Sequence, residues 1–341
     1  MTRRIIIHAG FDKCGSGSIR EALFRNFGKL QTDGIFFLGK GLRTAREPGD
    51  FEVPIWELEQ AKEKRENLTQ RLSDEIGSVT GPSTDFVEIL SAENLKDFQM
   101  APLFAGLDGQ FEVSVIFYLR PQFQWIPSAW KQWELKIGMS LNDFVSYCIK
   151  TGTPGFQLGI DAWRRALPSA ALHVRFLIPE LLTEGDPARD FFHLIGLPLE
   201  RYDFGTQPMN PSLDFSILHV LSKNPHLFSG VHDNRLISAL ICAVPEKFQS
   251  TNIQMLSREE EARIEEHFRD ENLWILKTYC DGIDVDHIYR TYFTPREAKV
   301  TYSSMNETDL IYRCLGIILE SIADQVTTGD STIPRARGED N

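Results

Sequence analysis

Short apolar runs alternate with amphipathic segments along the first half of the chain. Runs rich in Ile, Val, Leu and Phe predict buried strands at residues 4–9, 34–39, 86–91, 112–119 and 172–178. Apolar residues at helical spacing predict helices at residues 17–28, 54–77, 95–104, 122–134, 139–151 and 156–166. Strands that alternate with helices are typical of an α/β fold with a central, mostly parallel sheet flanked by helices. Ligands of such sheets bind at the carboxyl ends of the strands.

Beyond about residue 185 the strand pattern stops and helical spacing continues. It predicts helices near residues 187–195, 211–223, 232–244 and 257–279. We therefore expect a single domain over residues 1–326, with an α/β core at 1–185 and a mainly helical cap at 186–326. The polar segment 327–341 lacks a core-forming pattern and is expected to be a disordered tail.

Composition narrows the class of protein. A chain of 341 residues with 42% hydrophobic content can bury one large core. Its formal charge of −12 argues against a nucleic-acid binder, although a local basic pocket can still hold an anion. No run of about 18 apolar residues occurs, so we expect no stable membrane insertion, and the apolar start is too short for a signal peptide. A cytoplasmic protein is the expectation. The five cysteines are scattered without a C-x-x-C pair, which predicts neither a disulfide framework nor a metal site.

The stretch HAGFDKCGSGS, residues 8–18, connects the first predicted strand to the first helix. Backbone N–H groups and the helix dipole converge on an anion in that context. Gly15 and Gly17 let the backbone curl close to a ligand, Ser16 and Ser18 offer hydroxyls, and Lys13 supplies a positive charge. The same residues also fit a plain turn in which Ser16 or Ser18 caps the helix.

A nucleotide triphosphatase is the first alternative for this loop. Its P-loop places lysine directly before the hydroxyl residue that binds magnesium. Here Lys13 precedes the glycine-serine run and no Gly-Lys-Ser follows. The order of residues therefore disfavours that class.

A second anchor follows the fourth predicted strand, in RPQFQWIPS at residues 120–128. Arg120 lies at the carboxyl end of the strand and Ser128 within the helix after it, so both can face one crevice. A surface arginine and an ordinary helix serine remain the alternative. Trp125 fits a core contact by its helical spacing and could also stack on an adenine ring.

Together the two segments resemble the PAPS-dependent sulfotransferase family, in particular bacterial carbohydrate sulfotransferases; PAPS is 3′-phosphoadenosine 5′-phosphosulfate. The family carries an early strand–loop–helix of the form P/H-K-x-G-T/S-x-S and a later strand followed by Arg-x7-Ser. The resemblance covers roughly residues 3–285 and includes ILSAENL at 89–95. It implies a P-loop-kinase-like sulfotransferase fold with a helical C-terminal half.

The resemblance also implies roles for individual residues. Lys13 would contact the 5′-phosphosulfate and its bridging oxygen, and Arg120 and Ser128 would bind the 3′-phosphate. The cradle for the phosphosulfate would consist of Gly15, Ser16, Gly17 and Ser18. The family more often has a hydroxyl residue where this chain has Gly17, which predicts weaker binding of the donor.

The implied reaction moves the sulfuryl group of PAPS to a hydroxyl or amine of a carbohydrate or glycoconjugate, leaving adenosine 3′,5′-bisphosphate. Glu93, just past the third predicted strand, is the first candidate for the base that takes the acceptor's proton, and Asp12 is the second. Glu93 also fits a carboxylate that stabilises the start of a helix. A nucleotide-dependent kinase and a nucleotide-binding scaffold that has lost turnover are the alternative functions.

Overall fold

The structure is a computed structural model in which residues 3–50, 53–78, 86–205, 212–249, 254–295 and 306–328 are described. The chain divides into two compact units, each treated by itself. The core unit comprises Met1–Trp125, Cys148–Gln207 and Ile264–Thr294. The helical unit comprises Ile126–Tyr147, Pro208–Arg263 and Pro295–Asn341.

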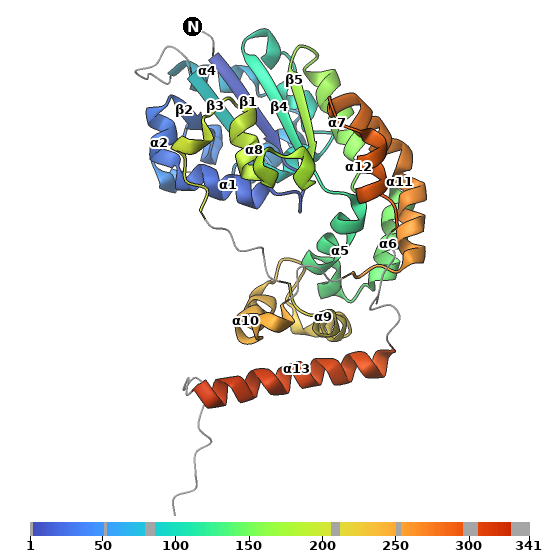
Figure 1. Ribbon diagram of the computed structural model, residues 1–341. Coiled ribbons are helices and arrows are strands. Elements are labelled where there is room, and N and C mark those ends of the chain that lie inside the picture. Colours follow the sequence, from blue (N-terminus) through green and yellow to red (C-terminus); the bar gives the residue numbers. More distant parts are fainter. Residues whose placement is uncertain are drawn as a thin grey trace, which may run out of the picture. The chain divides into compact units, whose positions relative to one another are not determined.

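A five-stranded sheet forms the centre of the core unit (Figure 1). Its strands are β1 (Arg3–Ala9), β2 (Ile35–Phe37), β3 (Phe86–Ala92), β4 (Glu112–Leu119) and β5 (Ala171–Phe176). They lie in the order β2-β3-β1-β4-β5, and every neighbouring pair is parallel. The predicted strands and the parallel α/β architecture are confirmed.

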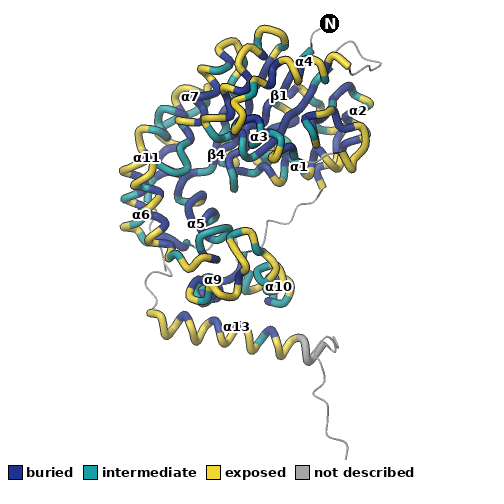
Figure 2. The backbone as a smooth tube through the Cα atoms, turned by 180° about the vertical axis from the view of Figure 1, so that it is seen from behind, coloured by how far each residue is buried: buried dark blue, intermediate teal, exposed yellow. Residues whose placement is uncertain are grey.

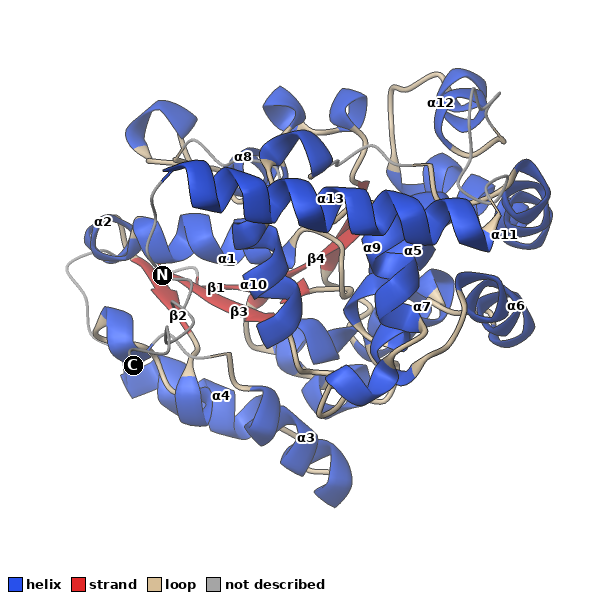
Figure 3. Ribbon diagram, turned by 90° about the horizontal axis from the view of Figure 1, so that it is seen from below, coloured by secondary structure: helices blue, strands red, loops and turns tan. Residues whose placement is uncertain are grey.

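Helices cover both faces of this sheet. Figure 3 shows α1 (Ser16–Arg25) and α8 (Pro187–Leu194) on one side, and α3 (Ile55–Lys64) and α4 (Thr69–Ser78) on the other. The strands between them are buried along most of their length (Figure 2). Burying each large apolar side chain stabilises the fold by about 1.5–3 kcal/mol. The unit also contains α2 (Phe27–Thr32), α7 (Phe156–Ala166) and α12 (Val285–Tyr292).

Several predicted helices differ in detail from the structure. The predicted helix at 17–28 breaks at Asn26, whose side-chain amide donates to the carbonyl oxygens of Ala22 and Asp203 at 2.8 and 2.7 Å. The predicted helix at 54–77 is two helices, because Arg65 has a left-handed φ of 53° and ends α3. The prediction for 95–104 is wrong: this stretch contains 3-10 turns at Glu93–Lys96 and Ala101–Phe104, with Pro102 in the second.

Three helices cross from one unit to the other: α5 (Gln122–Gln132), α6 (Leu141–Thr151) and α11 (Arg258–Tyr279). The helical unit adds α9 (Phe215–Ser222), α10 (Arg235–Ala243) and α13 (Glu307–Thr328). Because α13 extends to Thr328, the first two residues of the predicted tail are helical, and the rest of that tail lies outside the described residues. No helix in the described ranges is both long and apolar enough to cross a membrane.

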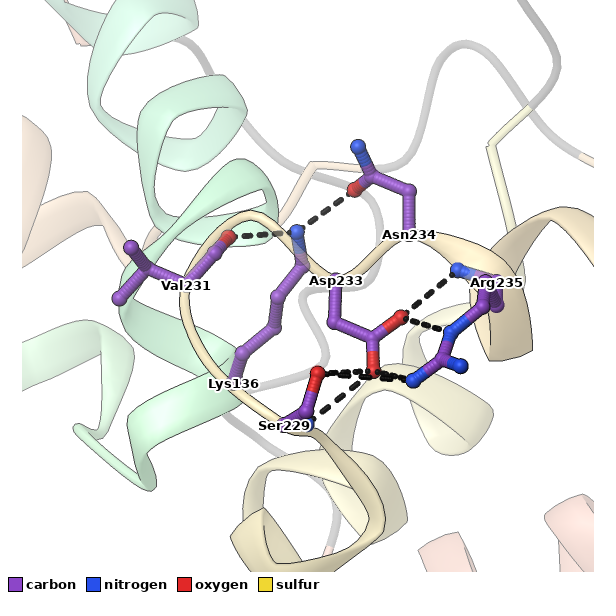
Figure 4. A network of polar contacts seen from close by, with 6 residues as sticks. All are labelled: Lys136, Ser229, Val231, Asp233, Asn234 and Arg235. Atoms are coloured by element: carbon purple, nitrogen blue, oxygen red, sulfur yellow. Dashed lines mark hydrogen bonds and ion pairs between the residues drawn. The ribbon is translucent and has the colours of Figure 1, made fainter.

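Polar contacts hold the loop before α10 in place (Figure 4). The buried Lys136 ammonium donates to the carbonyl oxygen of Val231 at 2.8 Å and to the side-chain oxygen of Asn234 at 2.6 Å. Asp233 accepts hydrogen bonds from Arg235 and Ser229, and these hold the pKa of its carboxyl well below the usual value. Each charged group of this network therefore has its partners within the helical unit.

Candidate functional site

Three of the predicted site residues follow adjacent strands of the sheet. Glu93 directly follows β3, Arg120 directly follows β4, and Lys13 lies in the loop after β1. Since β3, β1 and β4 are neighbours and parallel, their carboxyl ends meet at one edge. A hydrogen bond of 3.2 Å from the Gly10 amide to the Ala92 carbonyl joins the ends of β1 and β3. The sheet thus brings Lys13, Glu93 and Arg120 together.

The loop after β1 has an unusual backbone. Lys13 has a φ of 61° and Gly15 a φ of 85°, both in the left-handed region. Glycine adopts this conformation without strain, whereas lysine rarely does. A Cβ atom on Gly15 would also lie 3.3 Å from Cδ2 of Leu177. Backbone strain of this kind gathers at binding and catalytic sites.

Gly15 is the N-cap of α1, and no side chain caps this end of the helix. The interpretation of Ser16 or Ser18 as N-cap is therefore wrong. The first bond within the helix is donated by the amide of Ile19 to the carbonyl of Gly15 at 3.3 Å. The N–H groups of the three residues before Ile19 have no acceptor within the helix. Such N–H groups, together with the helix dipole, favour an anion at this position.

Two partly desolvated cations lie beside this helix end. Burial lowers the pKa of Lys13, and the positive charge of Arg120 lowers it further. Burial also lowers the pKa of Arg120. Nε of Arg120 is buried and lacks a hydrogen-bond partner among the residues that the structure describes. A buried donor without an acceptor is costly, so Nε of Arg120 favours a bound anion.

Glu93 is the acidic member of the site. Its carboxylate accepts a hydrogen bond from the hydroxyl of Ser16 and another, 3.2 Å long, from Nη2 of Arg20. The Ser16 hydroxyl, predicted to face the phosphosulfate, is thus engaged by Glu93, and its side chain is buried. Glu93 also acts on Lys13, whose pKa it raises. Two cations, Lys13 and Arg20, therefore interact with this carboxylate.

Asp12, the second candidate for a base, forms an ion pair with Lys96. Burial lowers the pKa of Lys96 to about 8. Asp12 and Glu93 are thus each paired with a cation, and the choice of Glu93 as the first candidate for the base stays a prediction.

Two other groups near the loop are unsuited to acid–base or nucleophilic chemistry at neutral pH. Burial raises the pKa of the Cys14 thiol to about 12, so the thiolate is scarce. Burial lowers the pKa of His8 to about 3, and its Nδ1 lies 2.8 Å from the hydroxyl oxygen of Ser91. Both side chains act as buried parts of the sheet's edge.

Two further residues, Trp125 and Gly159, contact the loop after β1. The sequence did not predict these contacts. Trp125, on α5, is only 4% exposed, and its indole N–H donates to the carbonyl oxygen of Asp12 at 2.8 Å. Gly159, on α7, lies so close to the loop that a Cβ atom there would be 2.9 Å from the Lys96 carbonyl oxygen and 3.0 Å from Cζ of Phe11. A glycine inside a helical pattern was the available signal for this close approach.

The remaining predicted residues are placed as follows. Ser18 lies in the first turn of α1 and is partly exposed. Gly17 is exposed in the same turn, and a Cβ atom there would meet nothing within 4 Å. Ser128 lies on α5 in the helical unit, so its joint action with Arg120 stays a prediction.

Comparisons with models of protein families, with curated proteins and with solved structures found no match. The function must therefore be argued from the site itself.

Proposed function

We propose that the protein is a sulfotransferase that binds 3′-phosphoadenosine 5′-phosphosulfate at the carboxyl edge of its sheet. One observation carries the proposal: Lys13 and Arg120, on loops after adjacent strands, are two desolvated cations beside the uncapped start of α1. This arrangement suits a ligand with two separate anionic groups.

The residues present fit such a donor. The N–H groups at the start of α1 and the ammonium of Lys13 would hold the phosphosulfate. Arg120, whose Nε lacks a partner in the described part of the chain, would hold the 3′-phosphate. When bound, the donor supplies the sulfuryl group and departs as adenosine 3′,5′-bisphosphate.

Different residues of the chain would then have different roles in the transfer of the sulfuryl group. A hydroxyl oxygen of the acceptor forms a bond to sulfur while the bond from sulfur to the bridging oxygen breaks. Lys13 stabilises the negative charge that grows on that bridging oxygen. Glu93 takes the hydroxyl proton, and Ser16 and Arg20 hold its carboxylate in place. We propose a carbohydrate or glycoconjugate as the acceptor.

Titration calorimetry distinguishes this function from that of a kinase. We expect adenosine 3′,5′-bisphosphate to bind without magnesium and more tightly than ATP with magnesium. No heat of binding with millimolar bisphosphate would refute the donor site. Tighter binding of ATP with magnesium would favour the kinase alternative. Bisphosphate binding without transfer to any acceptor would favour the scaffold alternative.

A further inference from the structure

A cleft of about 720 Å³ opens to solvent in the core unit, away from the loop after β1. One wall is α4, where Arg71, Glu75 and Ser78 lie four and three residues apart and so share one face of the helix. The other wall is segment 40–50, which follows β2. Every residue lining the cleft is polar, charged or glycine, so the cleft suits a hydrated ligand rather than an apolar one.

Positive charge predominates in the cleft. Its lining includes four cationic residues and two acidic ones. Both acidic residues already have backbone partners: Glu75 accepts from the Thr44 amide at 2.8 Å, and Asp50 accepts from the amides of Arg46 and Glu47 at 3.2 Å. Within the described ranges, the exposed side chains of Arg43 and Arg46 form no ion pair. The cleft therefore offers cationic groups to a ligand from solvent.

The floor of the cleft adds little negative charge. The Thr44 hydroxyl donates to Oε1 of Glu88, which is buried in β3, at 2.9 Å. Burial raises the pKa of Glu88 to about 8, so its carboxyl is mostly protonated at neutral pH.

The cleft follows the edge of the sheet beside β2. Its lining includes Gly41, past the carboxyl end of β2, and Ser78, the last residue of α4. Helix α3 forms hydrogen bonds both to Gly41 and to the turn that carries Glu93. Glu57 of α3 accepts from the Gly41 amide at 2.7 Å, and the side-chain amide of Asn94 donates to Glu59 at 3.1 Å.

We propose that this cleft binds an acidic saccharide, a carboxylated or sulfated sugar chain. Arg43 and Arg46 bind its anionic groups, and the carboxylates and carbonyl oxygens of the lining accept hydrogen bonds from its hydroxyls. The oligo(U) arm of the test below distinguishes this ligand from a nucleic acid. The assignment of this saccharide as the acceptor rests on the proposed function.

The test is titration of the full chain with an oligogalacturonate, a malto-oligosaccharide of equal length, sodium sulfate and oligo(U). We expect the oligogalacturonate to bind and the double variant R43Q/R46Q to weaken that binding at least tenfold. The control K277Q/R290Q removes the same charge from exposed positions on α11 and α12, and we expect it to bind like the unchanged protein. Bound oligogalacturonate should slow hydrogen exchange in segments 40–46 and 71–78.

Several results would overturn the cleft proposal. The first is no binding of oligogalacturonate. The second is binding of the neutral sugar, of sulfate or of oligo(U) with the same affinity as oligogalacturonate. The third is an equal loss of affinity for oligogalacturonate in R43Q/R46Q and K277Q/R290Q. Adenosine 3′,5′-bisphosphate is titrated into the same preparations. Its binding fails only if the donor site is wrong, so failure of the cleft and failure of the proposed function are distinguishable.

Discussion

The indole nitrogen of Trp125 and the carbonyl oxygen of Asp12 are 2.8 Å apart and joined by a hydrogen bond. This bond connects the first turn of α5, next to Arg120, to the loop that carries Lys13. Lys13 and Arg120, the two cations proposed to bind the donor, are therefore positioned relative to each other by this hydrogen bond. The bond involves neither of their side chains.

Replacing Trp125 with Phe keeps an aromatic ring and removes the donor of this bond. We expect a loss of about 1–2 kcal/mol in the free energy of unfolding, because the Asp12 carbonyl loses a partner, and weaker binding of adenosine 3′,5′-bisphosphate. Trp130 is the matched control, since its indole N–H also donates to a carbonyl, that of Met139, at 2.8 Å. W130F should lose similar stability in urea and bind the bisphosphate normally; equal losses of binding in both variants would contradict the role of Trp125.

Replacing Gly17 with Ser adds the hydroxyl that the resemblance leads one to expect. The position has room for it and an ordinary φ, so we expect a gain of about 0.5 kcal/mol in helix stability and tighter bisphosphate binding in calorimetry. Gly28 on α2 has similar room, and G28S should gain stability without a change in binding. Unchanged binding by G17S would show that the start of α1 does not contact the ligand.

Replacing Glu93 with Gln separates binding from catalysis. The change removes a negative charge beside Lys13, so bisphosphate binding should be unchanged or tighter. It also removes the proposed base, so transfer to a working acceptor should fall by about 10²–10⁴-fold. Assays of both quantities on one preparation check this, and an undiminished transfer rate would exclude Glu93 as the base.

The raised pKa of Glu88 predicts that the free energy of unfolding depends on pH. Its pKa of about 8 in the folded chain exceeds the ordinary value of 4.5, so the folded state keeps a proton that the unfolded state releases. Stability should therefore fall between about pH 4.5 and 8, by up to about 1.4 kcal/mol per pH unit, and then level off. Urea unfolding at several pH values should show this slope reduced in E88Q and retained in the exposed control E63Q. Equal slopes in all three proteins would contradict it.

The sequence predicted the sheet well because buried strands produce contiguous apolar runs, as at β1 and β4. It also predicted that Lys13, Glu93 and Arg120 lie at one edge, since parallel strands place their carboxyl ends together. The ends of the helices were harder to predict from the sequence. The break at Asn26 depends on a bond to Asp203, which is distant in the sequence.

Contacts between distant segments also explain what the sequence could not predict in the site. The Ser16 hydroxyl has Glu93 as its acceptor, 77 residues away, and local spacing suggested a cap or a ligand contact instead. Trp125 fitted an apolar helix face equally well with or without its bond to Asp12. The basic cleft combines α4 with segment 40–50, and neither part has a recognisable motif.

The most direct test of the central claim compares adenosine 3′,5′-bisphosphate with AMP, which lacks the 3′-phosphate. We expect the unchanged protein to prefer the bisphosphate, and R120A to bind it with a loss of about 1.5–3 kcal/mol while its affinity for AMP stays the same. R120K, which keeps the charge, should lie between, and R165A on the exposed face of α7 should bind normally. Equal affinities of the unchanged protein for the two nucleotides, or equal losses for both in R120A, would contradict the account.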